Sequence, residues 1–200
     1  TVRRLAAAVG AEAVLTIRWR AGDLDRLLDE GHAALCVAIA AVLAREGGLV
    51  EPEGAFAVLG ERGSIDLLAW HAPTRTLVVI EVKTEITSAE ELLRRLDVKA
   101  RLAAGVARER FGWDAASVVT MLVLPDTSTA RRRVVRLAPL LASRFPLRGA
   151  QARAWMREPA GPSPRGLLLF LSPTIPGRTI RDPIARKRQR GPEAGRDQAH

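Results

Sequence analysis

The stretch that decides the fold covers residues 60–84, GERGSIDLLAWHAPTRTLVVIEVKT. It holds two runs rich in strand-forming residues, 64–70 and 77–83, and a polar segment with Pro73 between them. Branched and aromatic apolar residues favour strands, whereas proline among polar residues favours a turn. The stretch therefore predicts two antiparallel strands joined as a hairpin.

Three ionisable residues fall within this predicted hairpin. Side chains alternate between the two faces of a strand, so Glu81 and Lys83 share one face of the second strand. In the first strand we expect Asp66 to share a face with Leu68 and Ile65 to lie on the opposite face. The hairpin can then place Asp66 beside Glu81 and Lys83, with apolar neighbours around them. Two carboxylates and one ammonium group are costly to bury unless they pair with one another or bind a metal ion.

The elements around the hairpin follow from apolar periodicity and from capping residues. We predict an α/β domain with the following elements in chain order: a helix over 23–46 that ends at Gly47, a strand over 49–59 that completes an antiparallel meander with the hairpin, a helix over 88–111 between Ser88 and Gly112, a buried strand over 117–124, a helix from Thr127 or Ser128 to Phe145, and a strand over 166–172. The acids and His32 in the first half of the first helix are expected to form a solvated polar face.

Composition narrows the class of protein. Lys and Arg number 31 against 22 Asp and Glu, which gives a net charge of +9 and favours an anionic partner, most simply nucleic acid. Cys36 is the only cysteine, so a disulfide within the chain and a cysteine-rich zinc site are excluded, and we expect it to be a plain buried residue. No apolar run approaches the ~20 residues of a membrane span, and no signal peptide is visible, so we expect a reduced, cytoplasmic setting.

The two ends of the chain differ from its middle. Residues 2–10, VRRLAAAVG, resemble the last helix of an Xre-type helix-turn-helix domain. The resemblance implies that residues 1–20 are the stub of such a domain, with its DNA-reading helices upstream in a longer transcriptional regulator. We expect the main domain to cover residues 20–172. Residues 175–200 are basic and poor in apolar side chains, which predicts a disordered tail, either simply solvated or an electrostatic arm for nucleic acid.

The order of elements and the pattern Asp66…Glu81-Val82-Lys83 together resemble the PD-(D/E)XK nuclease superfamily, which includes restriction endonucleases and Holliday-junction resolvases. The resemblance covers about residues 23–124, with Ile65 where the motif has proline. It implies a restriction endonuclease-like core of helix, three-stranded antiparallel meander, helix and strand, here with an extra C-terminal helix and strand. The implied activity is hydrolysis of DNA phosphodiester bonds.

Roles for individual residues follow from the chemistry and from this resemblance. Asp66 and Glu81 carry oxygen ligands suited to Mg²⁺ or Mn²⁺, and the resemblance adds the Val82 carbonyl as a third ligand. A bound ion neutralises the phosphate and acidifies its water. Lys83 can orient the attacking water or stabilise charge that develops on phosphorus.

The chain departs from the superfamily in its first helix. Many relatives carry an acid midway along that helix, where this chain has Leu35 and Cys36. Glu30 is the nearest substitute and Asp29 a poorer one, while Glu51 and Glu53 are further acids that could reach the site. The missing acid keeps a second function open, that of a catalytically silent module of a DNA-binding regulator that serves binding or homodimer formation. A structural domain without a nucleic-acid partner is a third reading.

Basic residues on two helices are candidates for phosphate contact, with a simply solvated face as the alternative. On the helix over 88–111, Lys99 follows the apolar face of Leu92 and Leu96 and is therefore expected to point towards the site. The full set of candidate nucleic-acid contacts is Arg94, Arg95, Lys99, Arg131 and Arg132.

Overall fold

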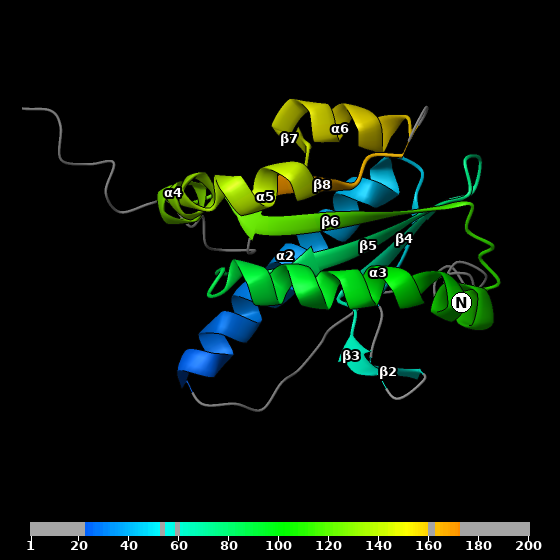
Figure 1. Ribbon diagram of the computed structural model, residues 1–200, viewed down its shortest axis with the longest axis horizontal. Helices are drawn as coiled ribbons and strands as arrows, with labels where there is room; N and C mark the ends of the chain where they lie inside the picture. The colour runs from blue at the N-terminus through cyan, green and yellow to red at the C-terminus, as the bar shows by residue number, and fades with distance from the viewer. Residues whose placement is uncertain (1–22, 53–54, 59–60, 160–162, 173–200) are drawn as a thin grey trace, which may run out of the picture.

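The computed structural model describes residues 23–52, 55–58, 61–159 and 163–172, in which helices cover both faces of a mixed β-sheet (Figure 1). The sheet has six strands in the order β1-β4-β5-β6-β8-β7. The described elements are α2 (Asp23–Arg45), β1 (Leu49–Pro52), β2 (Ala55–Val58), β3 (Glu61–Ser64), β4 (Leu67–His71), β5 (Thr76–Val82), α3 (Ala89–Phe111), β6 (Ser117–Pro125), α4 (Ser128–Arg136), α5 (Ala138–Arg144), β7 (Leu147–Arg148), α6 (Gly149–Arg157) and β8 (Gly166–Leu171). The predicted α/β class is confirmed.

The sheet is antiparallel in its first half and parallel in its second. β1, β4 and β5 form the predicted antiparallel meander, and β6 and β8 then lie parallel to β5. The hairpin turn between β4 and β5 is closed by the Arg75 N–H, which donates to the Ala72 carbonyl at 3.2 Å. β5 and most of β6 are buried on both faces, which explains why these strands are almost continuously apolar.

Two apolar clusters fix the helices to the sheet. On one face α2 and α6 pack on the strands, and the α2 side chains in this cluster are Leu35, Ile39 and Leu43. On the other face α3 packs with side chains from α4 and α5, including Val134, Leu141 and Phe145. The sheet is therefore the middle layer of three (Figure 1).

The helix after the hairpin lies where the sequence predicts it. The Ser88 hydroxyl accepts a hydrogen bond from the Glu91 N–H at 3.2 Å and caps the first turn of α3. Gly112 ends the helix in the left-handed region with a φ of 71°. The two caps fix the residues at which α3 begins and ends, and the apolar face of the helix packs on the sheet.

Two predicted strands are each split in the structure. The run over 49–59 becomes β1 and β2, because Pro52 has no N–H to continue the ladder, and β1 ends there at its pair with Leu67. The run over 64–70 becomes the end of β3 and the whole of β4, with a bend at Asp66. β2 and β3 pair with each other in a separate two-stranded sheet.

The C-terminal part of the domain also differs from prediction. The helix expected from Thr127 to Phe145 is interrupted at Leu137, because Pro139 has no N–H to donate to the Val135 carbonyl and lies instead in the first turn of α5, where no such donor is needed. The expected cap at Thr127 is confirmed, with its hydroxyl accepting from the Ala130 N–H at 3.2 Å. β7 and α6 were not predicted.

Several sequence predictions concern residues outside the described ranges. These are the helix-turn-helix stub at residues 1–20, the basic tail at 175–200, and Glu53. Among the helices that the structure describes, none is both long enough and apolar enough to cross a membrane.

Candidate functional site

The three residues predicted to be catalytic converge where β5 ends. Glu81 is the last residue but one of β5 and its side chain is 2% exposed. Lys83 follows the strand directly, and Asp66 lies in the bend that precedes β4. Because β4 and β5 are antiparallel, the start of β4 lies beside the end of β5, which brings the three residues to one end of the sheet.

Two lysines hold the Glu81 carboxylate. Lys83 Nζ lies 2.7 Å from Glu81 Oε1, and Lys99 Nζ pairs with Glu81 Oε2. Lys99 comes from α3, where it shares the buried stripe of Leu92 and Leu96 at helical spacing, so its predicted direction is confirmed. The lysines differ in access to water, since the Lys99 side chain is 10% exposed and that of Lys83 is 40% exposed.

Asp66 is fixed to the edge of β5 by a backbone hydrogen bond. The β4–β5 ladder ends at the pair of Leu67 with Ile80. The N–H of Val82, two residues further along β5, therefore has no β4 residue in register with it. Asp66 Oδ2 accepts the hydrogen bond from this N–H at 2.7 Å. In an extended strand the N–H and C=O of one residue point to the same side. The Val82 carbonyl therefore faces the side on which Asp66 lies.

The bend at Asp66 also corrects the predicted pattern of faces. Ile65 was expected on the face opposite Leu68, yet both belong to the apolar cluster under α3. Strict alternation fails because residues 65 and 66 are not part of a strand. Asp66 is thereby released from the face of the sheet, and its carboxylate can turn to the edge of β5.

Burial and a neighbouring carboxylate both disfavour the ionised form of Asp66. The pKa of Asp66 is raised above its ordinary value, chiefly by burial and then by the negative charge of Glu81. Lys99, the Val82 N–H and His32 act in the opposite direction but do not outweigh these two causes. The two carboxyl groups are therefore close enough to repel each other, and a cation bound between them would favour the ionised form of Asp66.

A histidine of α2 reaches this site, two residues after the predicted helix acid Glu30. His32 was expected on a solvated face, but its Nε2 lies 3.9 Å from Asp66 Oδ1. Glu30 is exposed at the beginning of the same region. A Cβ added at Gly31 would lie 3.3 Å from Thr84 Cγ2, so α2 passes close to the segment after β5. Sequence reasoning missed His32 because a lone histidine in a helix carries little signal.

Cys36 lies one helical turn after His32, in the region where the resemblance leads one to expect an acid. Burial, together with the negative charges of Asp66 and Glu81, raises the pKa of its thiol to about 12. The thiol is therefore neutral at physiological pH. It supplies neither a nucleophilic thiolate nor the missing carboxylate.

The remaining predicted acid, Glu51, is placed away from this group. It lies in β1 in register with Leu68, so β4 separates it from Glu81 in β5.

The predicted phosphate-contacting arginines fall on two exposed surfaces. On α3, Arg94 and Arg95 both bond the Glu91 carboxylate, at 2.8 Å and 2.5 Å. On α4, Arg131 bonds Asp126 at 2.6 Å and its guanidinium carbon lies 4.5 Å from the centre of the Phe170 ring. Arg132 is exposed on the same helix.

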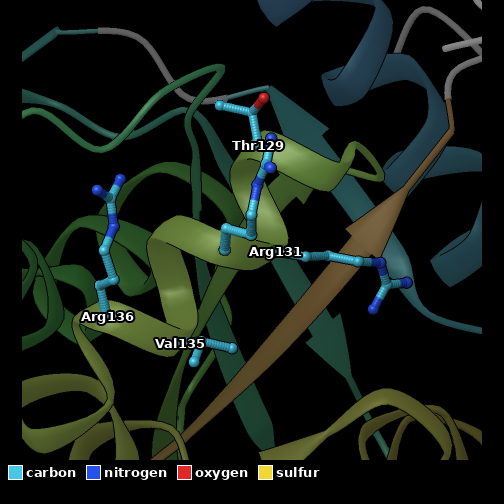
Figure 2. Close-up of a pocket in the computed structure, with 5 residues that line it drawn as sticks. Thr129, Arg131, Val135 and Arg136 are labelled. Atoms are coloured by element: carbon cyan, nitrogen blue, oxygen red, sulfur yellow. The ribbon is translucent and has the colours of Figure 1, made fainter. Parts of the chain in front are cut away.

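α4 carries a second group of exposed arginines. It comprises a depression lined by Thr129, Arg131, Arg132, Val135 and Arg136, and Figure 2 shows Arg131 and Arg136 extending in different directions from the helix. Arg133 points elsewhere and donates to the carbonyls of Ile86 and Thr87, at 3.1 Å and 3.0 Å. These two bonds hold α4 against the loop between β5 and α3, just beyond Lys83.

Comparison with known proteins adds no relative. No protein-family model matches the chain, and no curated protein is significantly similar to it.

The donor atoms at the site fit a hard divalent cation in part. Carboxylate and carbonyl oxygens of the kind gathered at Asp66, Glu81 and Val82 are the preferred ligands of Mg²⁺ and Mn²⁺. Within the described ranges, however, no three or more His, Cys, Asp and Glu side chains are already arranged as a metal-binding group. Both Glu81 oxygens are paired with lysines, so a bound ion would either share the carboxylate with these lysines or replace one of them.

Replacing Asp66 with asparagine is expected to make the metal-free protein more stable at neutral pH. A carboxyl group whose pKa is raised on folding contributes stability that is full below its ordinary pKa and is lost as the pH rises through the raised value. Asparagine can still accept the hydrogen bond from Val82 but carries no charge. In urea unfolding with EDTA, Asp66→Asn should exceed wild type at pH 7, and the difference should shrink as the pH falls towards about 4. A variant that is less stable than wild type at pH 7 would contradict the assigned cause of the shift.

Proposed function

We propose that this domain hydrolyses phosphodiester bonds in DNA with the help of a divalent cation, on a core of the restriction endonuclease type. The observation that carries the proposal is the convergence of Asp66, Glu81 and Lys83 at one end of the sheet. Charged residues that only keep a surface soluble can be scattered over it. These three lie together instead, and the Glu81 side chain is buried.

The order of elements supports the proposed core. α2 is followed by the antiparallel meander of β1, β4 and β5, then by α3, and then by β6 parallel to β5. This is the arrangement that the resemblance implies. The β2–β3 hairpin is an insertion within the meander, between β1 and β4.

The chain's own residues have distinct parts in the proposed reaction. Asp66, Glu81 and the Val82 carbonyl hold the cation, which when bound neutralises the phosphate and lowers the pKa of its water. Lys99 keeps the second Glu81 oxygen in place through its buried ammonium group. Lys83 has solvent access and can leave Glu81 to meet the scissile phosphate, where its charge stabilises the negative charge that develops.

DNA is the proposed substrate because of charge and its placement. The net charge of the chain is +9, and α4, which Arg133 ties to the loop after β5, carries exposed arginines. Contacts from Arg131, Arg132 and Arg136 to phosphates would position a duplex without reading its sequence. Such binding weakens steeply as salt concentration rises.

DNA cleavage tests the proposal directly. Wild-type protein should nick or cut plasmid DNA in Mg²⁺ or Mn²⁺ and lose this activity in EDTA. Asp66→Asn should abolish cleavage, while Glu90→Gln, a matched loss of charge at an exposed position on α3, should retain it. Cutting that persists in Asp66→Asn rejects the assignment of the site.

A second candidate function is a nuclease-like module that binds DNA without turnover. Two observations favour it: both Glu81 oxygens are occupied by lysines, and a neutral Cys36 lies in the region of the expected helix acid. This candidate predicts salt-dependent DNA binding by wild type, with no cleavage in either cation.

A further inference from the structure

We propose that the outer face of α2 is a self-association surface, on which a second copy of this chain packs its own α2 in the antiparallel direction. The outer face comprises the exposed residues of α2 whose side chains the structure describes, namely Glu30, Val37, Ala41, Ala44 and Arg45. The inference is independent of the proposed DNA cleavage, because the outer face is turned away from the candidate site.

The outer face is apolar where a helix that faces solvent is normally polar. Residues 33–44, AALCVAIAAVLA, contain no charged side chain, although Val37 is 61% exposed and Ala41 and Ala44 are also exposed. The opposite side of α2 packs on the sheet through residues such as Leu35, and within the described ranges the elements that α2 contacts most extensively are all strands. A helix that is apolar on all sides is normally buried on all sides, which indicates that a partner covers the outer face.

The apolar residues of this helix face follow the spacing of a coiled-coil seam. Ala34, Val37, Ala41 and Ala44 are separated by three, four and three residues, so they form one row along the helix. Alanine keeps the row shallow, which lets a second helix approach to the short end of the usual ~8–10 Å between helix axes. A helix that carries the same kind of row therefore fits this surface.

The charges at the two ends of the row favour a second α2 that runs antiparallel. Glu30 and Arg45 are exposed near opposite ends of the row, and the midpoint between them lies directly after Val37. A twofold axis through that midpoint places Glu30 of each copy beside Arg45 of the other copy, and Ala34 beside Ala41. A parallel pair in register would instead bring like charges together. The surface is therefore complementary to itself, as a twofold dimer requires.

The proposed dimer leaves the candidate site accessible. His32 lies on the side of α2 that approaches Asp66, away from the outer face. Gly31 approaches Thr84 after β5, and in the antiparallel pair it lies beside Ala44 of the second copy. The two candidate sites are therefore at opposite ends of the helix pair, and neither is covered by the association.

Sedimentation equilibrium of the full chain over a range of concentrations tests the inference. The average mass of wild type should rise from 21.7 kDa towards twice that value. A single helix pair is small beside the ~1,200–2,000 Å² of a standard interface, so the dimer should dissociate on dilution.

A charge placed at the centre of the row should disrupt the dimer. Val37→Glu puts two carboxylates next to the twofold axis and should weaken association about 100-fold or more, because like charges that face each other across an interface repel strongly. Ala41→Glu, at another exposed position of the row, should also weaken it. The matched control is Val135→Glu, which makes the same change at a 73% exposed valine on α4 and should associate as wild type does. Circular dichroism checks that each variant is folded.

Charge reversal tests the antiparallel direction. Glu30→Arg and Arg45→Glu should each weaken the dimer by about threefold or more, since each variant brings like charges together at two symmetric positions. The double variant Glu30→Arg/Arg45→Glu should restore association, because opposite charges meet again.

Four results would overturn the inference. Wild type that stays monomeric at every concentration shows that no second copy covers the outer face. Association of Val37→Glu and Ala41→Glu at wild-type strength places the contact on another surface. An assembly of more than two copies contradicts a twofold contact, which closes at two. Failure of the double variant to recover what both single variants lose contradicts the antiparallel pairing. None of these results bears on DNA cleavage, which is measured separately.

Discussion

Replacement of Lys99 with methionine is expected to lower the free energy of unfolding by about 2–4 kcal/mol. Removing one partner of a buried ion pair leaves an uncompensated charge, which typically costs 3–5 kcal/mol. Here Glu81 would keep its second partner, Lys83, so the expected loss is about 1 kcal/mol smaller than in that range. Urea unfolding at pH 7 measures the difference.

Two further variants show whether the ion pair is the cause. Lys83→Met removes the exposed partner and should cost less than about 1 kcal/mol, as exposed pairs do. The double variant Glu81→Leu/Lys99→Met replaces the buried pair with apolar side chains and should regain most of the stability lost in Lys99→Met. Equal losses for the two single lysine variants would contradict the assigned difference in burial.

Replacement of Lys83 with alanine is expected to lower the rate of DNA cleavage about 100-fold or more while the protein stays folded. Loss of one group that stabilises developing charge reduces kcat by about 10²–10³. The side chain is 40% exposed, so its removal leaves no buried space. Single-turnover cleavage with saturating Mn²⁺ separates this effect from any change in metal binding.

A second variant, Lys83→Arg, shows whether positive charge alone is sufficient at this position. Arginine keeps the charge but spreads it over a planar fork, so it should recover only part of the activity. Cleavage by Lys83→Ala within about threefold of wild type would show that the ammonium has no part in the reaction, even if the metal site is correct.

The sequence predicted the central part of the fold because its signals there are local. Ser88 and Gly112 frame α3, and Pro73 with its polar neighbours marks the turn between β4 and β5. The errors arose where tertiary contacts decide between alternatives. Nothing local indicates that residues 55–58 pair with 61–64 rather than continue β1, and no periodic pattern marks a helix as short as α6.

The candidate site was predictable in part for the same reason. Asp66, Glu81 and Lys83 could be grouped because the hairpin joins them through one turn. Lys99 could be oriented because it continues the apolar stripe of its own helix. His32 could not be found, since its approach to Asp66 depends on how α2 lies across the sheet, and that follows from packing between residues far apart in sequence.

The central claim, that a divalent cation belongs between Asp66 and Glu81, is tested most directly by Mn²⁺ binding to the metal-free protein. Titration followed by electron paramagnetic resonance should show wild type and Glu90→Gln removing free Mn²⁺ from solution. Asp66→Asn should bind the ion at least about tenfold more weakly, although it is folded and more stable without metal. Equal Mn²⁺ binding by wild type and Asp66→Asn, or none by wild type, would contradict the account.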